Sequence, residues 1–121
     1  MVFISDEVFD GGLDYADTNG DSLTICSTDP GGVYATVTGN ALATEVVNTG
    51  ATEAGAIDGR RVQVPAITAG SITATGTASH WALTDGTGVV IASGALSATQ
   101  AVTSGNSFTL DAVSVTIRDA A

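Results

Sequence analysis

Two spacings of apolar residues divide the chain into a short N-terminal helix and a long β region. Before residue 20, small and apolar residues recur at i, i+3, i+4 and i+7, the spacing of one helix face: Phe9, Gly12, Leu13 and Ala16. Ser5 stands before two acidic residues, as at a helix N-cap, and Asn19-Gly20 is typical of a helix end. The pattern predicts a helix over residues 5–19.

From residue 22 the apolar period becomes two, the period of a half-buried strand. In L-T-I-C, apolar residues alternate with Thr and Cys, and the D-P-G-G stretch that follows is typical of a turn. We therefore expect a first strand at 22–27. Residues 33–58 show no sustained period, and we expect one or two short strands within a long surface excursion there.

Stronger strand patterns begin at Arg60. Apolar and small residues alternate with threonine between Ile72 and Ala78, which predicts a strand with one buried face. Turns are expected at Ala-Gly, residues 69–70, and at Asp-Gly-Thr-Gly, residues 85–88. The second of these turns joins two antiparallel strands.

The last apolar stretch changes its phase. Apolar residues occupy even positions from Phe108 to Ala112 and odd positions from Val113 to Ile117. Because a strand places alternate residues on opposite faces, the two halves require a bulge or a change of sheet near residues 111–113.

These patterns predict a mainly β fold: an antiparallel β-sandwich or jelly-roll-like domain of about seven or eight strands with one N-terminal helix. We expect a single domain over residues 1–121. It comprises the helix at 5–19 and the sandwich at 22–119, which carries the long excursion at about 31–58.

Small residues dominate the composition and limit the core. Thr, Ala, Ser and Gly make up about half of the 121 residues, while Leu and Ile together supply 13. Burial of a Val or Ile contributes about 1.5–3 kcal/mol, against an ordering cost of about 1–2 kcal/mol per residue, so the margin of stability is small. We expect association with a partner, most simply as a homo-oligomer such as a trimer.

The charge balance restricts the classes of partner. The chain has no lysine, three arginines and thirteen acidic residues, for a net charge of −10. It would repel a polyanion, so we expect no nucleic-acid partner, whereas a basic protein surface would attract it.

Membrane insertion, secretion and metal binding are not indicated by the sequence. The start M-V-F-I-S-D-E lacks the basic region of a secretory signal, and no apolar run approaches the length of a membrane span. We expect no membrane partner and synthesis in the cytoplasm. Cys26 is the single cysteine, and no Cys/His cluster has the spacing of a zinc site, so we expect neither an intramolecular disulfide nor a cofactor.

The single histidine, His80, lies next to the single tryptophan, Trp81, in the stretch T-A-S-H-W-A-L-T-D-G. A triad of Ser79, His80 and Asp85 is rejected because neighbours on a strand point to opposite faces, which keeps serine and histidine from hydrogen-bonding. We expect no catalytic residue and no enzymatic activity. Trp81 is expected to cap the core, and His80 to lie at a rim or a partner interface.

The stretch D-Y-A-D-T-N-G-D, residues 14–21, is superficially similar to a calcium loop. In the EF-hand register that places Gly20 sixth, position one is Tyr15 and position twelve is Cys26, so both essential carboxylates are missing. The sequence favours a helix end at Asn19-Gly20 and predicts no metal site.

Two charged groups are candidate partner surfaces, together with His80. Four aspartates fall on one side of the predicted helix, as a solvated face or as a docking stripe for a basic partner: Asp6, Asp10, Asp14 and Asp17. Arg60 and Arg61 can make bidentate contacts with a partner's carboxylates, or can keep an edge strand from pairing.

Two segments within residues 60–119 form a recognisable pattern: R-R-V-Q-V-P-A-I-T-A-G-S-I-T-A-T-G-T-A-S-H-W-A-L and A-S-G-A-L-S-A-T-Q-A-V-T-S-G-N-S-F-T-L. They resemble a family of small tailed-phage proteins, largely from phages and prophages of alphaproteobacteria and encoded among virion structural genes. The stretches F-I-S-D-E-V-F-D-G-G-L-D-Y and L-T-I-C-S-T-D-P are similar to the same family, and residues 31–58 depart most from it. The resemblance implies a virion component without a known catalytic residue.

Within a virion, a small acidic β domain with a thin core fits a capsid decoration or cement protein. Such a protein binds the major capsid protein on the outer face of the shell in many copies, each through a modest interface. We therefore expect localisation on the capsid surface after synthesis in the host bacterial cytoplasm. A tail or fibre-associated adhesion module and a head–tail connector component are the alternatives.

Overall fold

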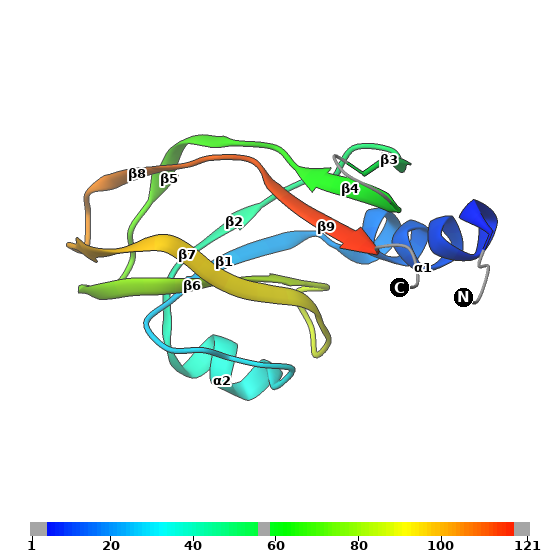
Figure 1. Cartoon of the computed structure of the whole chain (residues 1–121). Helices are drawn as coiled ribbons and strands as arrows, with labels where there is room; N and C mark the ends of the chain where they lie inside the picture. Colours follow the sequence, from blue (N-terminus) through cyan, green and yellow to red (C-terminus); the bar gives the residue numbers. More distant parts are fainter. Residues whose placement is uncertain (1–4, 56–58, 118–121) are drawn as a thin grey trace.

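The computed structural model describes residues 5–55 and 59–117, and this part of the chain forms two helices and nine strands (Figure 1). The helices are α1 (Asp6–Asn19) and α2 (Tyr34–Gly39). The strands are β1 (Ser22–Cys26), β2 (Ala41–Val46), β3 (Glu53–Ala54), β4 (Arg60–Val64), β5 (Ile67–Ser71), β6 (Gly76–Thr84), β7 (Val90–Val102), β8 (Ser107–Leu110) and β9 (Val113–Ile117). The predicted class, a mainly β sandwich-like fold with an N-terminal helix, is confirmed, with nine strands instead of seven or eight.

Two layers of antiparallel strands face each other. One layer is a four-stranded sheet in the order β2-β1-β6-β7, and the other consists of a three-stranded sheet, β3-β4-β9, and a two-stranded sheet, β5-β8. Figure 1 shows the second layer above the first, with α2 beneath the four-stranded sheet and α1 at the right-hand end. This arrangement gives the four-stranded sheet one face toward the other strands and one face toward α2.

The expected phase change near residues 111–113 is a change of sheet. β8 pairs with β5, and β9, which is separated from β8 by two residues, pairs with β4. The strands that pair with them make the same change of sheet, because only Pro65 and Ala66 separate β4 from β5. Both Leu110 and Val113 pack against the core on either side of the corner, which explains why the apolar positions move from even to odd numbers.

The core between the two layers gathers around Trp81. This side chain packs against both main clusters of buried residues, which include Leu42 and Ile72 at one end and Leu23 and Leu83 at the other. The expectation that Trp81 packs into the sandwich core is confirmed. Its indole lies against the backbone of Gly94 on the paired strand, where an added Cβ would come within 3.1 Å of three ring atoms.

The segment expected as a surface excursion, about 31–58, is instead built into the fold. It contributes α2, β2 and β3, and it buries Val37, Leu42 and Ala43. Val37 of α2 packs with Cys26 and Ala82 on the outer face of the four-stranded sheet. Helix α2 could not be predicted from the sequence because its six residues, Y-A-T-V-T-G, are too few to show a helical period. They also include β-branched residues, which favour strands.

The expected turn at residues 69–70 is also wrong. Ala69 and Gly70 lie within β5, and Gly70 pairs with Phe108 of β8. An added Cβ at Gly70 would collide with the Phe108 ring. This glycine therefore serves a close side-chain contact rather than a change of chain direction.

Helix α1 docks at the end of the sandwich through Leu13 and Ala16, which pack against Val62 of β4. It ends at Gly20, as expected, although its φ of −78° is not the left-handed value typical of a C-cap glycine. The Gly20 amide donates to the Ala16 carbonyl at 2.7 Å, and an added Cβ would lie 2.5 Å from that oxygen and 3.1 Å from Leu83. Lack of space, not the backbone angle, accounts for glycine here.

We predict that Gly20→Ala lowers the free energy of unfolding by about 1–3 kcal/mol, because the backbone oxygen of Ala16 cannot move away without disturbing the helix end. Chemical denaturation measures this. Gly32→Ala is the matched control, because no atom lies within 4 Å of its added Cβ, and its effect should stay within about 0.5 kcal/mol. Equal effects of the two substitutions would contradict the packing argument.

Candidate functional site

Asp10 of the predicted acidic stripe is tied to the chain's own arginine. Nε of Arg60 donates to Oδ1 of Asp10 at 2.8 Å, and Nη2 donates to Oδ2 at 3.3 Å. The two side chains are only 21% and 29% exposed. This two-pronged contact joins α1 to the first residue of β4, so it fastens the helix to the sandwich.

The other aspartates of the stripe are used differently. Asp17 accepts a hydrogen bond at 2.7 Å from the hydroxyl of Thr49, a buried residue beyond the end of β2. The Asp14 side chain is exposed and has no hydrogen bond or ion pair with the described residues. The Asp6 side chain lies outside the described part of the structure. Two aspartates of the stripe, Asp10 and Asp17, therefore hold α1 in place. The role of the stripe in docking a partner stays a prediction.

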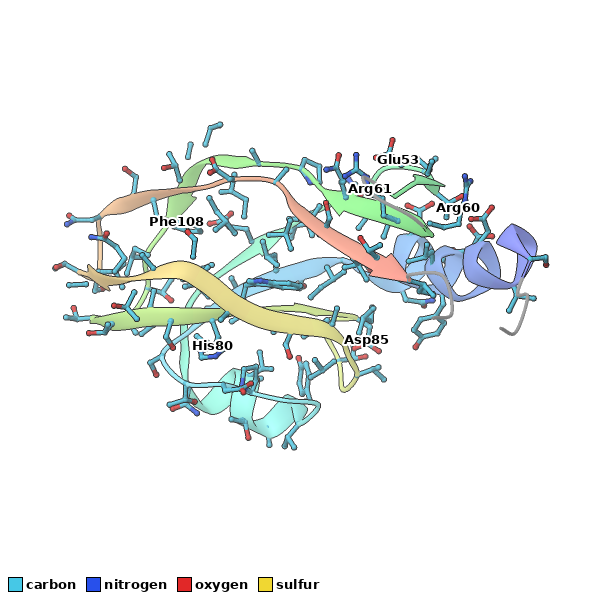
Figure 2. All side chains as sticks on the ribbon, in the orientation of Figure 1. Glu53, Arg60, Arg61, His80, Asp85 and Phe108 are labelled. Atoms are coloured by element: carbon cyan, nitrogen blue, oxygen red, sulfur yellow. The ribbon has the colours of Figure 1, made fainter. Side chains whose placement is uncertain are left out.

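Arg61 also finds its partner within the chain. Its Nε donates to Oε1 of Glu53 at 2.9 Å, and the two residues face each other across the β3–β4 pair. Figure 2 shows Arg61 beside Glu53, with Arg60 toward α1. The alternative in which the arginines protect an edge strand is wrong, because β4 is the middle strand of its sheet.

His80 lies on the opposite face of the sheet from Trp81, as expected. It pairs in register with Cys26, which packs toward α2, and Figure 2 shows the imidazole on the α2 side of β6. However, Nδ1 of His80 lies 2.8 Å from the hydroxyl of Ser79. The reason given for rejecting the triad is therefore wrong: the register of β6 with β7 shifts between Ala78 and His80, and neighbouring side chains can meet there.

Asp85 does not complete this pair. It stands five residues after His80 on an extended strand, about 16 Å away at the rise of a β-strand, and Figure 2 shows the two side chains well apart along β6. Oδ1 of Asp85 accepts from the backbone amides of the next turn, at 2.9, 2.9 and 3.0 Å: Thr87, Gly88 and Val89. These amides lower the pKa of Asp85 to about 2, which identifies the carboxylate as the organiser of the β6–β7 turn.

Cys26 is a structural thiol in this fold. It is fully buried beneath α2, and burial raises the pKa of the thiol. Thiol reactivity depends on the thiolate and on access to solvent, so both properties work against it here.

The structure leaves a groove, not predicted from the sequence, between β7 and the β8–β9 corner. Two cavities of about 350 and 550 Å³ lie along it and share Gln100 and Thr109. Trp81 and Leu96 line the larger cavity. We name this groove the open seam and define it by the residues of its two walls: 95–98, 100–103 and 106–113.

A break in the pairing of β7 shapes the open seam. Ala78 pairs with Gln100, whereas His80, two residues later, pairs with Ala95. Residues 96–99 of β7 therefore stand opposite Ser79 without register partners on β6. Residues 95–98 and Gln100 of β7 form one wall of the larger cavity, and the corner that passes through Asp111 forms the other.

The open seam is nearly free of charge. From Gly86 to Ile117 the sequence contains one charged residue, Asp111, in a chain whose net charge is −10. This long uncharged stretch is the signal that could have revealed the surface from sequence alone. Its register break could not have been seen there, because alternation of small residues such as Ala, Ser and Thr carries little phase information.

Comparison of the chain with protein-family models, curated proteins and solved structures found no match. Neither helix of the described residues is long and apolar enough to cross a membrane. Within residues 5–55 and 59–117, no three His, Cys, Asp or Glu side chains gather in a group that could hold a metal ion. Activity, partners and localisation therefore stay predictions.

We predict a coupling of about 0.5–1 kcal/mol between Asp10 and Arg60 in a double-mutant cycle of Asp10→Asn and Arg60→Gln. The free energies of unfolding of the four proteins give this value, which should fall in about 1 M NaCl as the charges are screened. Asp14→Asn, which removes the same charge from the same helix, should change stability by less than about 0.5 kcal/mol. A coupling of zero at low salt would show that the ion pair does not hold α1.

We predict that the Asp85 carboxyl titrates at a pKa of about 2, measured by NMR. Because folding depresses this pKa, its contribution to stability is complete above the unfolded value near 3.8 and is lost as the pH falls toward 2. Asp85→Asn should therefore lower the melting temperature at neutral pH and have little effect at about pH 2. A titration near 3.8 in the folded protein would refute the role of the three amides.

Proposed function

We propose that this chain is a structural component of a tailed-phage virion, and specifically a capsid decoration or cement protein. The observation that carries the proposal is the resemblance of T-A-T-G-T-A-S-H-W-A-L and Q-A-V-T-S-G-N-S-F-T-L to the phage family. In the structure these stretches lie in and around β6, β7 and β8, which frame the core and the open seam. The resemblance therefore falls on residues that define the architecture.

The arrangement suits a protein that works by adhesion to a shell. Acidic residues concentrate before residue 86, and the α1 end of the molecule presents the exposed Asp14 and Asp17. A basic capsid surface would attract this acidic end. Burial of modest areas across capsid-subunit joints, repeated over many copies, would then hold neighbouring subunits together.

Counting the copies of this protein in purified particles tests the proposal. A decoration protein should be present on the order of hundreds of copies on the head, since it repeats with the shell lattice. Particles lacking it should lose resistance to heat and to osmotic shock. A count of tens or fewer, or unchanged resistance, would contradict the cement function and favour a connector or tail location.

A tail or fibre-associated adhesion module is the second candidate, favoured by one observation. Trp81, which lines the open seam, lies near hydrogen-bonding groups that include Gln100 and Asp111. An aromatic ring beside such groups is suited to stacking on a sugar ring. Because Trp81 is the single tryptophan, quenching of its fluorescence by host-surface glycans would support adhesion, and no response would remove the support that this observation gives.

A further inference from the structure

We propose that the open seam is the surface through which two copies of this chain associate, with residues 95–102 of β7 pairing antiparallel across a two-fold axis. The two four-stranded sheets would then join into one continuous sheet, and the partner would cover the larger cavity. This proposal concerns the isolated protein and does not depend on the capsid function.

The four-stranded sheet protects one edge and leaves the other open. At the β2 edge, the carbonyl of Leu42 accepts from the amides of Thr73 and Ala74 at 2.8 and 3.2 Å. Nearby, the Glu45 carboxylate accepts from the Ser71 amide at 2.8 Å. The opposite edge is β7, the last strand of the sheet, and residues 97–101 along it are exposed.

β7 also lacks the features that keep an edge strand from pairing. Natural edges are short, or carry charges or proline. β3, by contrast, is two residues long and includes Glu53. β7 is 13 residues long, with the sequence V-I-A-S-G-A-L-S-A-T-Q-A-V, and has neither a charge nor a proline. An edge of this kind is a template for another strand.

The charge of the molecule favours a second copy as the occupant of the open seam. Two molecules that each carry a charge of −10 repel each other, so they can meet closely only where charge is absent. The stretch from Gly86 to Ile117, with Asp111 as its single charged residue, provides that surface. A basic partner would instead be drawn to the acidic end of the molecule. A two-fold pairing also lets one strand serve both copies.

Analytical ultracentrifugation of the full chain tests the proposal, from about 1 to about 100 μM and at about 50 and 500 mM NaCl. We expect a reversible dimer that tightens with salt, because salt screens the repulsion between the acidic ends. The emission of Trp81 should shift to the blue as the dimer forms, since this residue lines the larger cavity. A monomer throughout this range would overturn the proposal.

Substitutions locate the interface. The double variant Ser97→Lys with Thr99→Lys places two charges on the exposed edge and should weaken the dimer at least about tenfold. Thr18→Lys with Thr38→Lys makes the same charge change at exposed positions of α1 and α2 and should leave the dimer intact. Circular dichroism checks that all variants fold. A dimer that the edge variant leaves unchanged would overturn the proposal.

Hydrogen exchange of the unmodified protein gives a measurement that does not depend on any variant. Alternate backbone amides within residues 95–102, those that point away from β6, should become more protected as the protein concentration rises, because they enter a new ladder. Concentration-dependent protection confined to α1 or to β3 would overturn the proposal by placing the contact elsewhere.

Discussion

The fold depends on close contact between its few large side chains and glycine backbones. Half of the chain consists of Thr, Ala, Ser and Gly, so a packed interior requires that scarce aromatic rings fill space efficiently. Trp81 of β6 lies on Gly94 of β7, and Phe108 of β8 lies on Gly70 of β5. Each contact binds one strand to its neighbour and fills the interior between the layers. A side chain at either glycine would occupy the volume that the ring now fills.

These contacts also explain where the sandwich stays open. Each aromatic ring joins two strands of one layer: Trp81 joins β6 to β7, and Phe108 joins β8 to β5. At one side of the sandwich, hydrogen bonds to the Leu42 carbonyl connect β2 to the segment that follows β5, so this side is closed. On the other side, β7 diverges from the register of β6, and the β8–β9 corner turns into a different sheet. The register shift of β7 therefore faces the β8–β9 corner, and the open seam is the space between them.

Long, repetitive features of the sequence predicted the structure well. The α1 spacing and the phase change at residues 111–113 each rest on several large or β-branched residues, and each matches the structure. The threonine alternation after Ile72 matches in part: Ile72 and Ala78 are buried and the threonines between them are exposed, but residues 72–75 lie outside the strands and β6 begins only at Gly76. Features that depend on one small residue could not be predicted. Helix α2 is too short for a period, Gly70 resembles a turn glycine until its contact with Phe108 is known, and the shift at Ser79 has no sequence signature. For the same reason the open seam was missed.

Charge is divided along the chain in a way that separates two kinds of contact. Before residue 86, several carboxylates make hydrogen bonds within the molecule. Asp10 pairs with Arg60, Asp17 accepts a hydrogen bond from the Thr49 hydroxyl, and Asp85 accepts hydrogen bonds from the amides of its turn. These bonds fix α1 and the β6–β7 turn, but the helix still presents exposed Asp14 to solvent. From Gly86 to Ile117 only Asp111 is charged, and the contact proposed between two copies would use the backbone edge of β7. An acidic end and a neutral edge on one small domain allow attraction to a basic surface and close approach between copies to occur at different places, because neither contact requires the other's residues.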